Sequence, residues 1–194
     1  MIVESVIVGP IHTNCYLATH DGQTLIIDPG ADASKIISKI TELKLKPAAV
    51  INTHGHWDHI MADNEIKKHY GIPLYIPAGD RDLVAGQEEH YHIGKITPDL
   101  WYEDTLPLDL PLKLIHTPGH TPGSTCILWE NNLFTGDMMF AGGYLGRTDF
   151  PYGSADALQK SLPKLLALDD SVIVYPGHDG STIIGQERGF YAGK

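Results

Sequence analysis

Four side chains able to bind a metal ion lie within six positions of the sequence. The segment 53–59 reads THGHWDH, and its ligand-type residues are His54, His56, Asp58 and His59. In an extended chain alternate side chains share a face, so the first two histidines can hold one cation. Apolar residues from Ile60 onward indicate a helix, which displaces the second pair from the first. Two adjacent pairs suit two adjacent metal ions, and imidazole with carboxylate suits zinc, iron or manganese.

Later in the sequence, three apolar strands are each followed by a glycine-containing loop. Each loop carries one further residue able to bind a metal ion. These ligands are His120, Asp137 and His178. Glycine and proline beside the two histidines let the backbone turn sharply, so that side chains from different strands converge. Strand ends are also where open sheets place their sites. His116 lies at a strand end and is interpreted as structural, and no third ligand accompanies His90 and His92.

The elements that must position these ligands form a repeated pattern of strands and helices. Strands are expected at 2–8, 14–19, 24–27, 47–51, 74–76, 112–115, 125–129, 133–135 and 172–175, and helices at 33–45, 64–70, 80–85 and 155–168. The first three strands predict an antiparallel meander, and strand–helix units follow it twice. We therefore predict an α/β fold of two mixed β-sheets packed together with helices outside. The irregular stretch 87–104 is either a substrate-covering loop or an ordinary surface connection.

Composition limits the class of protein. The 194 residues are 42% hydrophobic, enough for a core, and we expect one domain over 1–194. A net charge of −10 would repel a phosphate backbone, which argues against nucleic acid as a partner. No segment has the length of a membrane span and no basic leader precedes the chain, so a cytoplasmic protein without membrane attachment is expected. Cys15 and Cys126 lie in apolar contexts and are predicted to be buried thiols.

Together these motifs resemble the metallo-β-lactamase superfamily, and within it a small glyoxalase II-type hydrolase, over nearly the full length. The resemblance implies the αββα four-layer sandwich of that superfamily. It also implies two metal ions, one held by His54, His56 and His120, the other by Asp58, His59 and His178, with Asp137 bridging them. Zinc is expected first, with iron or manganese as alternatives. The implied reaction is hydrolysis of a thioester such as S-lactoylglutathione by a metal-bound hydroxide, which Asp58 would orient.

Substrate recognition is less constrained by the sequence. Arg147 stands in the segment GRTDFP, where relatives carry a basic residue that meets the anionic end of the substrate, and Tyr144 is a second candidate. Arg147 could instead pair with Asp149 and brace its own loop. Full-length glyoxalase II enzymes continue into a helical domain that helps to hold glutathione. We expect no such domain here, which leaves the thiol carrier open.

Two other functions fit parts of the motif set. A persulfide dioxygenase of the same superfamily would hold one iron through two histidines and an aspartate, which His54, His120 and Asp137 could supply. A non-enzymatic zinc-sensing or structural protein is the other alternative. Seven ligand-type residues argue against it, because a closed structural zinc site needs only four.

Overall fold

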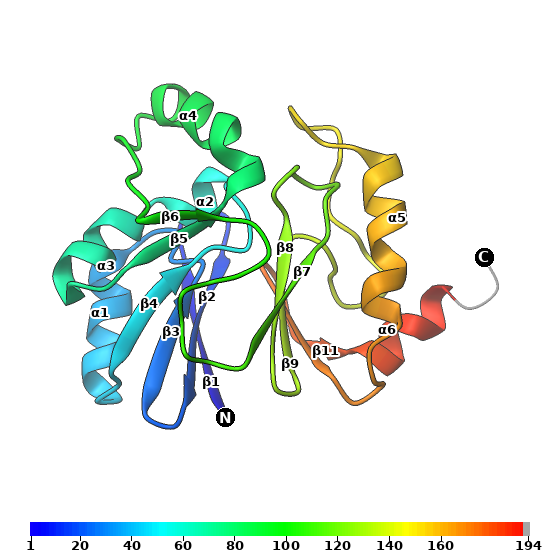
Figure 1. Ribbon diagram of the computed structural model, residues 1–194, viewed down its shortest axis with the longest axis horizontal. Coiled ribbons are helices and arrows are strands. Elements are labelled where there is room, and N and C mark those ends of the chain that lie inside the picture. Colours follow the sequence, from blue (N-terminus) through cyan, green and yellow to red (C-terminus); the bar gives the residue numbers. More distant parts are fainter. Residues whose placement is uncertain (192–194) are drawn as a thin grey trace.

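The computed structural model describes residues 1–191 and consists of two mixed β-sheets that lie face to face with helices on their outer faces (Figure 1). The first sheet has the order β1-β2-β3-β4-β5-β6 and the second has the order β11-β10-β9-β8-β7. This arrangement confirms the predicted αββα sandwich. In the first sheet, β1 to β3 pair antiparallel, as the predicted meander requires, and β3 to β6 pair parallel.

The strands have the following bounds: β1 (Ile2–Val8), β2 (Thr13–His20), β3 (Gln23–Ile27), β4 (Pro47–Ile51), β5 (Leu74–Pro77), β6 (Leu100–Tyr102), β7 (Leu112–His116), β8 (Thr125–Trp129), β9 (Asn132–Gly136), β10 (Ile173–Pro176) and β11 (Thr182–Ile183). The helices are α1 (Ala33–Glu42), α2 (Trp57–Ile60), α3 (Asp63–Tyr70), α4 (Arg81–His90), α5 (Ala155–Leu166) and α6 (Ile184–Tyr191), and a 3₁₀ turn, η1 (Ala78–Asp80), precedes α4.

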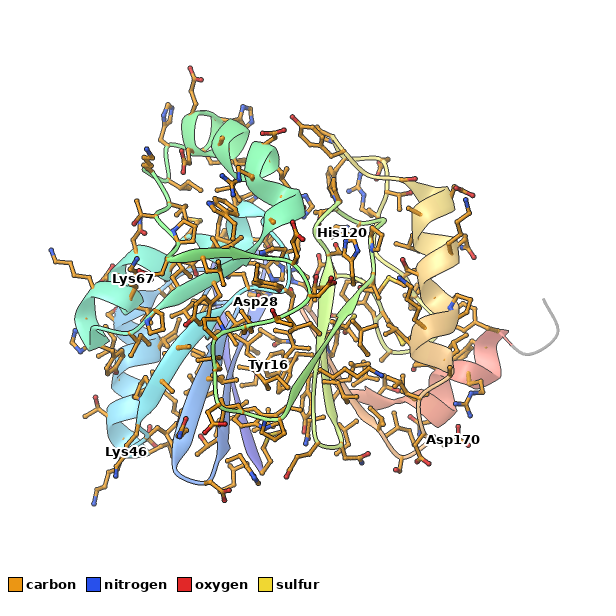
Figure 2. All side chains as sticks on the ribbon, in the orientation of Figure 1. Tyr16, Asp28, Lys46, Lys67, His120 and Asp170 are labelled. Atoms are coloured by element: carbon orange, nitrogen blue, oxygen red, sulfur yellow. The ribbon has the colours of Figure 1, made fainter. Side chains whose placement is uncertain are left out.

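Hydrophobic cores fill the three spaces between the four layers. Strand residues alternate between faces, so Ile26 of β3 packs outward against Ile36 of α1, whereas Leu25 and Ile27 face the second sheet. Figure 2 shows side chains filling the layer between the sheets, where Tyr16 is labelled. The third core joins the second sheet to α5 and α6. Burial of apolar surface in these three layers holds the two sheets together. Their adjoining edges can therefore contribute residues to one shared site.

The structure departs from the sequence expectations in three respects. Helices α1 and α5 end at Glu42 and Leu166 rather than at residues 45 and 168. The stretch 87–104 is more regular than expected, because α4 runs to His90 and β6 pairs in parallel with β5. The elements β11 and α6 were not predicted, since two glycines, Gly185 and Gly189, weaken the local helix signal.

The two cysteines are free and buried in separate cores, as predicted. Among residues 1–191, no helix is both long enough and apolar enough to cross a membrane.

Candidate metal centre

The seven predicted ligands come from loops and from the short helix α2 at one edge of the sandwich. After β4, the chain bends at Thr53 and His54, and His56, with φ of −69° and ψ of 146°, stands in an extended conformation immediately before α2. Asp58 and His59 occupy the first turn of α2, next to the first two histidines. The second sheet supplies His120 from the turn between β7 and β8, Asp137 after β9 and His178 after β10. Figure 2 labels His120 at the top of the layer between the sheets.

The ligand atoms of six predicted residues fall into two groups, and a third, overlapping group joins Asp28 to His54 and His59. One atom each from His54, His56 and His120 lies within 4.8 Å of the others, and the same is true of Asp58, His59 and His178.

Asp137 lies between the two groups. One of its carboxylate oxygens is 3.5 Å from His120 Nε2 and 3.6 Å from His178 Nε2, and the other is 3.5 Å from His59 Nε2. This position fits a carboxylate that bridges two ions.

Unpaired atoms show that the arrangement fits metal ions. His54 Nε2, His59 Nε2 and Asp137 Oδ1 are buried and lack a well-formed hydrogen bond within the described part of the chain, although His59 Nε2 lies 3.2 Å from Asp58 Oδ2 and 3.5 Å from Asp137 Oδ1. An unpaired buried polar atom costs about 1–3 kcal/mol, so three together need a compensating partner. Cations placed among the two groups would supply it.

The opposite ring nitrogens are held from outside the centre. His59 Nδ1 lies 3.0 Å from Asp28 Oδ2, and His120 Nδ1 lies 2.7 Å from the backbone oxygen of Arg147. Such outer contacts fix the ring orientation and direct the Nε2 lone pair inward, as in many metal sites. Asp28 also accepts hydrogen bonds from the backbone N–H and the hydroxyl of Thr53, both at 2.7 Å. It therefore connects the end of β3 to the first ligand loop.

The local electrostatics favour the protonation states that bind metal at His54, His56, Asp58 and Asp137. Burial, with the neighbouring histidines, lowers the pKa of His54 well below its ordinary value and that of His56 to about 3. Burial opposes ionisation of Asp58 and Asp137, but the nearby His59 outweighs it and holds the pKa of both carboxyl groups below the usual range. Neutral imidazoles and ionised carboxylates are the forms that coordinate a divalent ion. Burial lowers the pKa of His59 and His178, but the nearby Asp58 and Asp137 outweigh it and raise both pKa values, so a cation would displace a proton from these two imidazoles.

Asp80 joins the two loops of the first group from behind. Its carboxylate accepts hydrogen bonds from the backbone N–H of Gly55 at 2.7 Å, from the backbone N–H of Gly123 at 2.6 Å and from the hydroxyl of Thr121 at 2.8 Å. Gly55 lies between two ligands, and Thr121 directly follows a third. Neither Asp80 nor Asp28 was found from the sequence, because a single buried carboxylate has no local spacing signal.

A cleft of about 640 Å³ opens onto the centre. Its lining residues include predicted ligands from both groups. One wall contains Gly86, Gln87 and His90 of α4 and the next residue, Tyr91. Part of the stretch 87–104 therefore borders the cleft.

The two predicted substrate contacts are not among the lining residues, although the guanidinium of Arg147 borders the cleft, 4.3 Å from the ring centroid of Phe150. Arg147 makes two hydrogen bonds to Asp149, at 2.9 Å and 2.7 Å, and Tyr144 is 71% exposed; neither side chain is among those lining the cleft. His116 Nε2 lies 2.9 Å from the backbone oxygen of Pro122, a structural contact.

A two-sheet αββα sandwich with a paired histidine and aspartate centre at one edge defines a class of metal-dependent hydrolases. The family model described as the metallo-beta-lactamase superfamily matches residues 8–178. The chain belongs to the metallo-beta-lactamase superfamily.

Three relatives are similar over nearly their whole lengths. The chain is 36% identical to "Hydroxyacylglutathione hydrolase GloC" of Haemophilus influenzae, over 97% of this chain and 95% of that protein. Its structure resembles that of BLEG-1 B3 metallo-beta-lactamase, with 33% identity, a TM-score of 0.89 and coverage of 99% and 100%. It also resembles TTHA1623 in a di-iron-bound form, with 30% identity, a TM-score of 0.85 and coverage of 95% and 96%.

Proposed function

We propose that this protein hydrolyses small acyl thioesters at a centre of two divalent metal ions. The observation that carries the proposal is the position of Asp137, within 3.6 Å of ligand nitrogens from both groups. The similarity to a hydroxyacylglutathione hydrolase supports a thioester as substrate. The net charge of −10 argues against nucleic acid and favours a small molecule as partner.

The residues present suit this chemistry. Two bound ions would supply a water of lowered pKa and polarise the thioester carbonyl. Asp58 Oδ2 accepts a hydrogen bond from Thr13 Oγ1 at 2.9 Å and lies 3.2 Å from His59 Nε2 and 3.3 Å from His178 Nε2. These contacts fix the buried carboxylate where the cleft reaches the ligand atoms, so that it can accept a hydrogen bond from the attacking water. A thiolate leaves without a strong general acid, so no further protein acid is needed.

Zinc is our first proposal for the metal. Iron is the alternative, supported by the di-iron-bound form of TTHA1623. The donor set of imidazole and carboxylate accepts either metal.

The test is thioester hydrolysis by protein loaded with zinc, then stripped with a chelator, then reloaded. We expect turnover of S-lactoylglutathione or of the same acyl group on a smaller thiol, its loss on chelation and its return with metal. His178→Ala should lower the rate at least 100-fold, whereas His69→Ala, the same change at an exposed position on α3, should not alter it. Absence of turnover with oxygen uptake on a persulfide by the iron-loaded protein would instead favour the dioxygenase.

A further inference from the structure

Aromatic side chains line the cleft on both sides of the metal centre. On one side, the rings of Trp57 and Tyr91 pack together with centroids 5.1 Å apart and an interplanar angle of 31°. On the other side lie Phe150 and Tyr152, and the Phe150 ring stands edge-on to the ligand His56 with centroids 5.7 Å apart. A substrate that reaches the centre therefore passes between two aromatic walls.

These walls retain apolar surface that a ligand can cover. Tyr91 is 45% exposed, Phe150 is 40% exposed and Tyr152 is 58% exposed. Ile11 and Leu83 extend the apolar lining. Exposed apolar surface that rims a concave site is typical of ligand-binding clefts, because the ligand removes it from water.

Histidines are the basic side chains among the described residues that line the same cleft. Among the described residues that line it, none is lysine or arginine. Two arginines near the cleft contact other side chains. Arg147 pairs with Asp149 and lies over the ring of the lining residue Phe150, 4.3 Å from its centroid, and Arg81, the first residue of α4, stacks over Trp101 at 5.1 Å. His90 lies on the wall with its ring packed edge-on against Tyr91, at 4.6 Å between centroids.

Glutathione would be a poor fit to such a cleft. It carries two carboxylates, and recognition of carboxylates in proteins depends on charge-assisted hydrogen bonds, most often from arginine or lysine. The net charge of −10 adds a general repulsion of anionic ligands.

From the aromatic walls and the absence of lining cations, we infer that the cleft selects thioesters whose acyl group and thiol carrier are uncharged and apolar or aromatic. This inference rests on the thioester hydrolysis proposed above and specifies its substrate class. The aromatic walls would cover the apolar acyl group, while the thiol carrier occupies the open mouth of the cleft without an ionic anchor.

The first experiment compares four thioesters on the zinc-loaded protein. The lactoyl and phenylacetyl groups are each linked to glutathione and to N-acetylcysteamine, a small neutral thiol. We expect kcat/KM to be at least tenfold higher on the neutral carrier for each acyl group, and at least tenfold higher for phenylacetyl than for lactoyl on that carrier. Equal or higher values for the glutathione thioesters would overturn the inference and leave thioester hydrolysis standing. No hydrolysis of any of the four would overturn the proposed function itself.

A second experiment adds the missing charge. Gly86 lines the cleft from α4, and a Cβ built there meets no atom within 4 Å, so Gly86→Lys can be accommodated. The ratio of kcat/KM on glutathione to that on N-acetylcysteamine should rise at least fivefold. Gly189→Lys is the matched control, because Gly189 lies on α6, a Cβ there also meets no atom within 4 Å, and the change in net charge is the same. An equal ratio in the two variants would contradict the inference.

The aromatic wall has its own pair of variants. Tyr152→Ser should raise KM for the phenylacetyl thioester at least fivefold, because Tyr152 lines the cleft. Phe190→Ser changes an exposed aromatic residue on α6, outside the cleft, and should leave KM unaltered. The inference fails if both variants keep the wild-type KM.

Discussion

Replacement of Asp80 by alanine would remove the connection between the two loops of the first metal group. The carboxylate of Asp80 accepts hydrogen bonds from the backbone N–H groups of Gly55 and Gly123, and its loss leaves both donors buried and unpaired. The Thr121 hydroxyl keeps a second partner, Ser124 Oγ at 2.8 Å, and needs no replacement. Only two donors therefore enter the estimate.

The magnitude follows from these two donors. An unpaired buried donor costs about 1–3 kcal/mol, so the two cost about 2–6 kcal/mol. Burial raises the pKa of Asp80 although its hydrogen bonds lower it, so burying this charge destabilises the wild type to some extent. Asp80→Ala removes that destabilising contribution. We therefore expect the lower part of the range, a loss of about 2–4 kcal/mol from a free energy of unfolding that is about 5–15 kcal/mol in most domains.

Urea unfolding of the zinc-loaded protein, followed by circular dichroism, measures this loss. Asp82→Ala is the matched control, because Asp82 is exposed two positions further along the chain and should change stability by less than about 0.5 kcal/mol. Zinc affinity should also fall about 10–100-fold in Asp80→Ala, as is common when an outer contact of a metal site is removed. If Asp80→Ala were as stable as Asp82→Ala, the role assigned to this carboxylate would be refuted.

Two further predictions concern packing around the centre and the buried thiols. A Cβ built at Gly30 would overlap the backbone oxygen of Asp58, so Gly30→Ala should destabilise the protein by about 3 kcal/mol in urea unfolding. Gly86→Ala is the control and should not destabilise it, because a Cβ there meets no atom within 4 Å. Equal stability of the two variants would contradict this prediction. Burial raises the pKa of Cys126 to about 12 and that of Cys15 well above its ordinary value, so neither thiol should react with a disulfide reagent at pH 8 until the protein is unfolded. Fast labelling of either thiol in the folded protein would show that it is not buried as described.

The sequence predicted those parts of the structure that leave a local pattern. Alternation along an extended segment predicted that His54 and His56 come together, and they do, although the chain bends at Thr53 and His54. The change to helical spacing placed Asp58 and His59 on the first turn of α2, where the His59 ring still packs against His54 with centroids 4.1 Å apart. The sandwich followed from the order of strands and helices. The helix over 184–191 was missed because its stability comes from packing in the third core, where Ile184 is buried, rather than from its own sequence.

Other parts of the site depend on contacts between distant segments. Asp28 and Asp80 lie 31 and 25 residues from the partners they hold, His59 and Gly55, and nothing in the adjacent sequence indicates either contact. For Arg147 the sequence left two roles open, and the structure shows the pair with Asp149, two residues away in the same exposed loop. Both charges lie at the surface, so they can pair within one loop without contacts to any other element.

The metal content of the protein tests the central claim most directly. Elemental mass spectrometry on protein purified without added metal, and again after zinc loading, gives the number of ions per chain. The arrangement of two ligand groups around Asp137 predicts about two ions per chain in the loaded wild type and at most about one in Asp137→Ala. One ion or none per chain in the loaded wild type would contradict a two-metal centre.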